Sequence, residues 1–458
     1  MVLTAKWQPR SLCDCGGLLE SVQRKWQTSF GDNSDWFGRP IIMTNVFERF
    51  ESTVQSAVRA SPIVFDKASG SELFDERGNR YIDFHSSGGS QSFGHCNIKV
   101  CSALIDYLCN DRVVQSRDRR SVAKRNFIQT FASRILQPRG LDHRILITDP
   151  ANGMAIEIAL RIARRSKERI GIVAFTNSHH GLTEASLAVT SAAREPNAIV
   201  DFRRNVVFMP YCSYLGEDVD TIAYMRRYLE DSASGVELPA AVIVETTQVQ
   251  GGVKVASDRW LKGLEALCRE FGILLIVDET YTGFGRTGGF FSFEAAGINP
   301  DMIVASNALA SGLPISVLLL RPELDHWQQG DQVGVFQGDN LAFVAATEVL
   351  SQWSEIFAQE IAERSRNLAE ELAKLPTQFP HRKLRVRGKG MIWALEFDRP
   401  ASAAVVAAWA LERGLIIEPA QLKDDVLLVL PPLTIGEDVL REGLDYLGQA
   451  VAMFLKHA

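Results

Sequence analysis

Long apolar runs are missing from this sequence of 458 residues. No segment approaches the roughly 18 uninterrupted apolar residues of a membrane-spanning helix, so we expect no membrane partner. No basic run and no stripe of lysine and arginine interleaved with aromatic residues stands out, and the formal net charge is −6, so nucleic acid is not an expected partner. The first residues, MVLTAKWQPRSLCDCGG, lack the apolar centre of a signal peptide, and we therefore expect a cytoplasmic protein.

Cysteine is sparse and scattered. The chain has seven, an odd number, at positions 13, 15, 96, 101, 109, 212 and 268. This distribution indicates reduced thiols rather than a disulfide framework. Cys13 and Cys15 form a C-x-C pair, but no second pair or flanking histidine accompanies them, so no metal site is predicted.

Short apolar segments alternate with helix-like segments between about residues 98 and 330. In residues 155–168 and 258–272, among other segments, the apolar residues recur at the spacing of a helix. Strands that are apolar on both faces and alternate with helices predict an α/β fold, with a mostly parallel sheet covered on both sides. The strand-like runs are RILIT (144–148), IGIVAF (170–175), NVVFMP (205–210), AAVIVE (240–245), ILLIVDE (273–279) and DMIVAS (301–306).

These patterns divide the chain into three predicted parts. Residues 1–42 are an N-terminal extension, residues 98–335 form a large domain, and residues 43–97 and 336–458 together form a small α+β domain. Within the small domain we expect a helix from Phe47 to Arg59, a hairpin over residues 62–84 that turns at residues 76–79, and one long helix, either straight or kinked, over residues 342–375. A strand pair is expected around residues 384–397, with a helix over residues 402–413.

Asp278 is the strongest site candidate, because ligands of such sheets bind at the carboxyl ends of the strands. It closes a fully apolar strand, and a buried carboxylate needs a cationic partner. A protonated ring nitrogen of a ligand would serve, and so would Arg286. Both alternatives are open at this point.

Two further strand ends carry polar clusters. Glu245, Gln248 and Gln250 follow one strand and suggest a pocket wall, although strand-end capping is the plain alternative. His179 and His180 follow another strand, where paired histidines can transfer protons or stack on a ring. Two histidines without a third ligand do not predict a metal centre.

Several segments resemble the class III aminotransferases, and within them the diaminobutyrate transaminases, from about Val46 to the end. The matching segments include GSELFDERGNRYIDF, FGHCN, ILLIVDE, GFGRTG, FFSFEAAGINPDMI, GDNLAFV, RVRGKGM and LPPLTI. The resemblance implies the α/β large domain of pyridoxal-phosphate (PLP) fold type I together with an α+β small domain. It also implies a homodimer with its site at the interface, a small-molecule substrate, and Asp278 as the partner of the cofactor's pyridine nitrogen.

The resemblance also marks departures, the first at the family's cofactor-binding lysine. That lysine follows the strand matching DMIVAS, and Asn307 stands there instead. An amide cannot form the covalent link to PLP or carry protons for the reaction. No lysine lies between residues 301 and 316.

The family's phosphate-binding residues are replaced as well. Its Gly-Thr or Gly-Ser pair before a helix, which holds the phosphate through N–H groups and a hydroxyl, matches Asn152-Gly153. Its second ligand, a threonine donated across the dimer, matches Val335, which has no hydroxyl.

The positions around the cofactor ring are changed in the same way. The stacking aromatic matches His179, while His180 is kept and Thr280 covers the other ring face. Tyr281 replaces a glutamine. Val249 and Gln250 replace a Gly-Glu pair.

So many replacements around one pocket favour natural divergence over an engineered lysine replacement. Our first hypothesis is a repurposed, PLP-independent enzyme that performs condensation, cyclisation or elimination on an amino-acid-derived molecule, with PLP or its amine form (PMP) doubtful and no covalent cofactor. Its catalytic candidates are His179, His180, Glu245 and Asp278. One alternative keeps PLP or PMP bound noncovalently in an enzyme of diaminobutyrate transaminase type, and another is a non-catalytic partner subunit. The polar replacements favour the first, because a structural relic would fill its pocket with apolar groups.

Overall fold

The computed structural model describes residues 46–52, 63–117, 119–150, 153–191, 205–326 and 337–457. The chain divides into two compact units, Met1–Val64 and Phe65–Ala458. The described part of the first unit holds helix α2 (Val46–Phe50). It ends well before Arg59, where the expected helix was to end, and residues 53–59 lie outside the described residues. The predicted extension over residues 1–42, with Cys13 and Cys15, lies outside the described residues.

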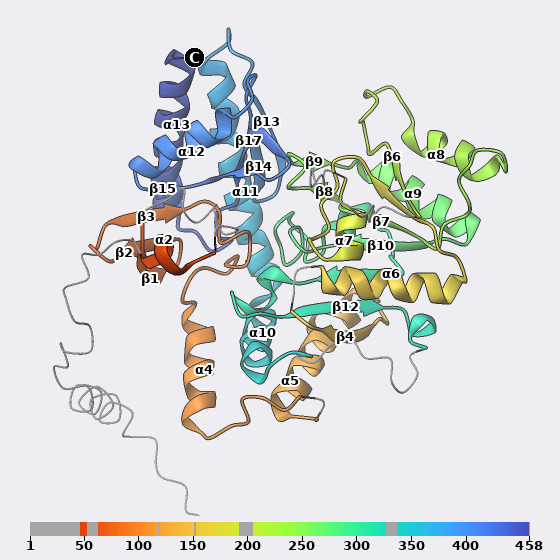
Figure 1. Cartoon of the computed structure of the whole chain (residues 1–458). Coiled ribbons are helices and arrows are strands. Elements are labelled where there is room, and N and C mark those ends of the chain that lie inside the picture. The colour runs from red at the N-terminus through yellow and green to blue at the C-terminus, as the bar shows by residue number, and fades with distance from the viewer. Residues whose placement is uncertain are drawn as a thin grey trace, which may run out of the picture. The chain divides into compact units, whose positions relative to one another are not determined.

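A seven-stranded sheet forms the centre of the second unit, in the order β4-β12-β11-β10-β7-β5-β6 (Figure 1). All six predicted strands are present, and their described pairings with one another are parallel. The seven strands are β4 (Arg144–Thr148), β5 (Ile172–Phe175), β6 (Val206–Met209), β7 (Ala241–Val244), β10 (Leu274–Asp278), β11 (Met302–Ala305) and β12 (Ser316–Leu320).

Strand β12 is the one that the sequence analysis missed. It runs antiparallel to both of its neighbours, β11 and β4. Only residues 306–315 separate it from β11, and they include a short 3₁₀ turn at Asn307–Ala310. A parallel return needs a crossover of a dozen or more residues, so this short connection forces the antiparallel direction.

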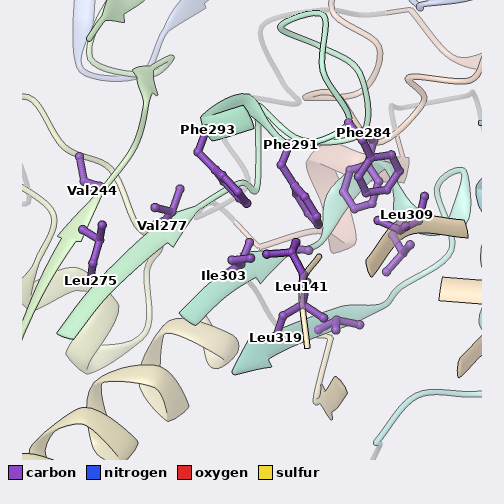
Figure 2. Close-up of a cluster of buried hydrophobic side chains, with 14 of the residues drawn as sticks. Leu141, Val244, Leu275, Val277, Phe284, Phe291, Phe293, Ile303, Leu309 and Leu319 are labelled. Atoms are coloured by element: carbon purple, nitrogen blue, oxygen red, sulfur yellow. The ribbon is translucent and has the colours of Figure 1, made fainter. Parts of the chain in front are cut away.

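Both faces of the sheet are buried, as its uninterrupted apolar strands predict. On one face, helix α6 (Met154–Lys167) packs against alternate strand residues such as Ile276 and Val304. On the other face, Val277 and Ile303 lie in a cluster with Phe291 and Phe293 (Figure 2). The helices that contribute to this second face include α5 (Val122–Phe131), α9 (Asp258–Phe271) and α10 (Asn340–Gln352).

Two four-stranded sheets lie outside the central one. The predicted hairpin is confirmed, with an antiparallel pair that turns at residues 76–79, where Asp75 accepts from the Asn79 backbone and side chain. The strands are β1 (Phe65–Ser69), β2 (Glu72–Asp75), β3 (Arg80–Asp83) and β15 (Leu415–Ile416) in one sheet, and β13 (Arg385–Lys389), β14 (Ile392–Glu396), β17 (Lys423–Val429) and β16 (Glu418–Ala420) in the other.

The expected long helix is two helices, α10 and α11 (Glu355–Gln378). Helix α10 ends at Trp353, and the Ser354 side chain then accepts from the Phe357 N–H, which caps the start of α11. The remaining helices include α4 (Ile98–Cys109), α7 (Glu184–Ala188), α8 (Thr221–Glu230), α12 (Ser402–Glu412) and α13 (Glu437–His457). Across the described ranges, every helix is too short or too polar to cross a membrane.

Candidate active site

A pocket opens where the central strands end. Residues just after β4, β5, β10 and β11 meet there with the first turn of α6 and the start of β12. Because β12 is antiparallel, its first residue lies at the same edge as the carboxyl ends of its neighbours. The lining residues are Ser90, Pro150, Gly153, Ala155, Ile156, His179, His180, Gly181, Asp278, Thr280, Tyr281, Val304, Ser306, Asn307, Gly312, Leu313, Pro314, Ile315 and Ser316.

Asp278 and His180 form a buried pair in this pocket. The His180 ring is fully buried, and its Nδ1 lies 2.8 Å from Asp278 Oδ2. Asp278 Oδ1 accepts from the Thr280 backbone N–H at 3.0 Å. A carboxylate acceptor fixes the hydrogen of His180 on Nδ1, and Nε2 then has no partner among the described residues.

Arg286 is not the partner of Asp278. Its fully buried guanidinium donates to Ser92 Oγ and to the Pro431 carbonyl. Arg286 as the cationic partner of Asp278 is therefore wrong. The Asp278 carboxylate can still accept a hydrogen bond from a ligand in the pocket. Arg286 instead connects the glycine-rich loop after β10, residues 283–289, to residues 92 and 431.

Glu245 lies behind the pocket wall rather than on it. Its Oε2 accepts from the His179 backbone N–H at 3.0 Å. Burial, and next the negative charge of Asp278, raise the pKa of Glu245 well above its ordinary value. Burial therefore favours the neutral form of the Glu245 carboxyl more than it would for an exposed glutamate.

His179 lines the pocket as a neutral imidazole. Burial, and next the neighbouring His180, lower the pKa of His179 to about 4, against a partial offset from Asp278. Its Nδ1 is buried without a hydrogen-bond partner among the described residues. A neutral imidazole keeps one nitrogen that can accept a proton.

The depressed pKa of His179 predicts an acid-side loss of stability. In the unfolded chain the His179 imidazole has a pKa near 6.5 and is protonated below that pH. In the folded chain it stays unprotonated until the pH falls to about 4. The contribution is therefore fully present above pH 6.5 and is lost as the pH falls toward 4, by up to about 3 kcal/mol. His179→Phe should flatten this slope in urea unfolding measured between pH 4.5 and 7. An unchanged slope in the variant would contradict the buried, neutral ring.

The first turn of α6 offers backbone N–H groups to the pocket. Gly153 precedes the helix with a φ of 88°, no side-chain cap is found there among the described residues, and Ala155 and Ile156 line the pocket. Unpaired N–H groups and the helix dipole make such an end suited to a phosphate. Asn152, predicted to belong to this site, lies outside the described residues.

Gly153→Ala should damage this helix end. A Cβ at Gly153 would clash with Ser186 and lie 2.9 Å from Thr183 Oγ1, at a φ that L-residues rarely adopt. We expect a loss of about 2 kcal/mol or more in the free energy of unfolding, measured in urea. Gly140→Ala is the matched control, because Gly140 also has a positive φ (64°) but open space around it. If both variants lost the same free energy of unfolding, the clash at residue 153 would not be the cause of the loss.

Asn307 sits at the pocket edge in the left-handed region, with a φ of 46°. Asparagine tolerates this conformation better than most residues. Its amide is loosely held, since Nδ2 lies 3.4 Å from the Gly88 carbonyl and Oδ1 lies 3.5 Å from Ser306 Oγ. Lysine does not occur among the described residues that line the pocket.

Tyr281 and Gln250 form a second polar pair. Gln250 Nε2 lies 3.1 Å from the Tyr281 hydroxyl, and Gln250 Oε1 accepts from the Gln421 backbone N–H at 2.8 Å. Gln248 donates to the Thr176 carbonyl at 2.8 Å and does not line the pocket.

Most of the predicted site residues meet in one place, although the roles assigned to them stay predictions. Glu245, Gln248 and Gln250 lie behind the lining, and Val335 lies outside the described residues. The predicted residues that line the pocket are Gly153, His179, His180, Asp278, Thr280, Tyr281 and Asn307. The sequence analysis missed Ser90, Ser306, Gly312 and Ser316. Ser306 is the last residue of the predicted strand 301–306, so the rule that ligands bind at strand ends could have found it.

Comparison with known proteins places this pocket in a family. Residues 53–451 match the family model described as aminotransferase class-III. The chain is 46% identical, over 90% of its length and 96% of the relative's, to a diaminobutyrate–2-oxoglutarate transaminase of Wolinella succinogenes. It is 44% identical, over 89% of its length and 94% of the relative's, to a protein of the same name from Bordetella parapertussis.

Solved structures share the fold. An S-selective transaminase from Arthrobacter sp. superposes with a TM-score of 0.81 at 20% identity, covering 90% of this chain and 98% of that one. The ornithine aminotransferase from Toxoplasma gondii gives 0.76 at 24% identity, covering 92% and 100%. A further crystal structure of the Toxoplasma enzyme has PLP at partial occupancy in its active site.

These findings overturn two expectations. The hypothesis of a repurposed, PLP-independent enzyme is wrong, because the relatives that share 44–46% identity over nine-tenths of the chain are named transaminases. The expectation that PLP is doubtful is wrong too, since PLP carries the chemistry of this family. The replacements around the pocket leave the fold of the family in place. The chain belongs to the class-III aminotransferases, and its fold is PLP fold type I.

Proposed function

We propose that this protein is a PLP-dependent enzyme of the diaminobutyrate–2-oxoglutarate transaminase type that holds its cofactor without a covalent bond. The observation that carries the proposal is the Asp278–His180 pair, buried in the same pocket that the first turn of α6 enters. A carboxylate at one point of a pocket and backbone N–H groups at another suit a ligand with a basic ring nitrogen and a phosphate. The names of the relatives supply diaminobutyrate and 2-oxoglutarate as the proposed substrates.

The residues present fit PLP. When bound, PLP acts as an electron sink that stabilises negative charge on an attached substrate carbon. Asp278 would keep the ring nitrogen protonated, and His180 would hold Asp278 in place by donating from Nδ1. Gly153 leaves open the approach to the N–H groups of α6, where a phosphate would be held.

Asn307 is the reason that the cofactor would be held noncovalently. It directly follows Ser306 after strand β11, at the place where we infer that the family's lysine stands. Its amide cannot form the covalent link. The weakly bonded Nδ2 could instead donate a hydrogen bond to a ligand in the pocket.

His179 is the residue that we expect to move protons in place of a lysine. It is neutral at physiological pH because its pKa is lowered to about 4, and a neutral imidazole keeps one nitrogen that can take a proton. The His180 ring is committed to Asp278 through Nδ1 and serves to position that carboxylate.

A single-turnover experiment tests the proposed function. Protein loaded with PMP is mixed with 2-oxoglutarate, and the glutamate formed per site is measured over time. We expect one glutamate per bound cofactor, and a reaction at least about tenfold slower in His179→Phe. Protein that binds PMP but forms no glutamate would contradict the proposal.

The same proposal includes a homodimer. Large apolar side chains are exposed along α4 and at the start of α5, in contrast to the buried faces of these helices. Ile98 is 75% exposed, Ile105 59% and Val122 56%. A second copy of the chain that covered these side chains would remove them from water. Light scattering that showed a monomer at micromolar concentration would contradict the dimer.

A further inference from the structure

The Gln250 side chain has a fixed orientation, and this decides the direction of its bond to Tyr281. Its Oε1 accepts from the Gln421 backbone N–H at 2.8 Å, and a backbone N–H can only donate. The other end of the amide is therefore the NH₂ group, which lies 3.1 Å from the Tyr281 hydroxyl. Gln250 is buried, so rotation of the amide would leave polar groups unpaired.

The Tyr281 hydroxyl oxygen consequently accepts the hydrogen bond from Gln250, and the hydroxyl hydrogen is not used in that bond. No acceptor for that hydrogen occurs among the described residues, while Tyr281 lines the pocket with Asp278 and His179. The ring itself packs against the apolar cluster around Val249 and Val426, which restricts its movement. A held hydroxyl with an unused hydrogen is a preorganised donor.

We propose that Gln250 holds Tyr281 as a hydrogen-bond donor toward a negatively charged oxygen of the bound ligand. The inference rests on the proposed function, which supplies two such oxygens: the 3-hydroxyl of PLP, when ionised, and a substrate carboxylate. Tyr281 would touch the ligand directly, and Gln250 would be a positioning residue that acts through it. The pair also connects the pocket to the turn at residues 420–423, because Leu422 N–H donates to the Gln250 carbonyl.

Binding measurements test the donor. We expect Tyr281→Phe to weaken PLP binding about tenfold in an absorbance titration if the ring oxygen is the acceptor, and to leave binding of a PLP analogue without the 3-hydroxyl unchanged. If the acceptor is the substrate carboxylate, PLP binds normally and the loss of about tenfold falls on 2-oxoglutarate binding to PMP-loaded protein. Tyr214→Phe is the matched control, because Tyr214 is 54% exposed and lies outside this pocket.

Gln250→Glu tests the positioning role. A carboxylate at residue 250 still accepts from the Gln421 N–H, but it would also accept from Tyr281 and turn the hydroxyl away from the pocket. We expect the same loss as in Tyr281→Phe, and no further loss when the two changes are combined.

The outcomes separate this inference from the proposed function. Unmodified protein that binds neither PLP nor PMP would overturn the proposed function itself. Unmodified protein that binds PLP, while Tyr281→Phe binds PLP, the analogue and 2-oxoglutarate unchanged, would overturn only the donor role of Tyr281. Additive losses in the double variant would show that Gln250 acts on the ligand by another route and would overturn the positioning role.

Discussion

Asp278→Asn should weaken PLP binding by one to two orders of magnitude. The substitution keeps the size of the side chain and its bond from the Thr280 N–H, but it removes the negative charge that would keep the ring nitrogen protonated. Loss of a charge-assisted hydrogen bond costs about 1.5–3 kcal/mol, which corresponds to roughly 10- to 150-fold in the dissociation constant. The measurement is an absorbance titration of purified protein with PLP.

Asp301→Asn is the matched control for this prediction. Asp301 is equally buried, and it stands directly before β11, at the opposite edge of the same sheet. It binds Arg269 at 2.9 Å and the Leu275 N–H at 2.8 Å, so its replacement should lower the free energy of unfolding without changing PLP affinity. Equal PLP affinity in Asp278→Asn and the unmodified protein would remove Asp278 from the cofactor site.

Asn307→Lys should convert a dialysable cofactor into a covalently held one. A lysine at this position supplies the amine that Asn307 lacks, in the pocket that His180 and Asp278 also line. We expect PLP to resist dialysis in the variant and to be fixed to the chain by borohydride. The change should also lower the free energy of unfolding by about 1 kcal/mol, because lysine tolerates a φ of 46° less well than asparagine does.

The control for Asn307→Lys is Asn307→Gln, which keeps an amide but carries the same backbone cost. It should lose stability to a similar extent and should not retain PLP through dialysis. If Asn307→Lys binds PLP but does not hold it covalently, residue 307 does not stand where we infer that the family's lysine stands.

Much of the central sheet follows from local sequence. Its six predicted strands are uninterrupted apolar runs that must be buried on both faces, and such runs are readable without knowing their neighbours. Strand β12 (Ser316–Leu320) was missed because it is equally apolar but has no helix before it, so the alternating pattern skips it. The break at Trp353 and Ser354 was missed because helical spacing continues across it, and only the cap at Ser354 marks the second helix.

The candidate site was readable where it follows strand ends. Asp278 ends strand β10 and His180 lies in the loop after strand β5, so the common edge of the sheet brings them together. Ser90 and Gly312 belong to segments far apart in the sequence, and only tertiary packing brings them to the pocket. The choice between Arg286 and a ligand as the partner of Asp278 also needed coordinates, because sequence spacing does not show which way a buried arginine points.

The most direct test of the account uses the unmodified protein. It is titrated with PLP while the absorbance spectrum is followed, treated with borohydride, denatured, and weighed by mass spectrometry. The account predicts a saturable spectral change and a polypeptide mass that borohydride leaves unchanged, since PLP is bound but not linked to the chain. A spectrum that never saturates would contradict PLP binding, and a chain that gains the mass of reduced PLP would contradict noncovalent binding.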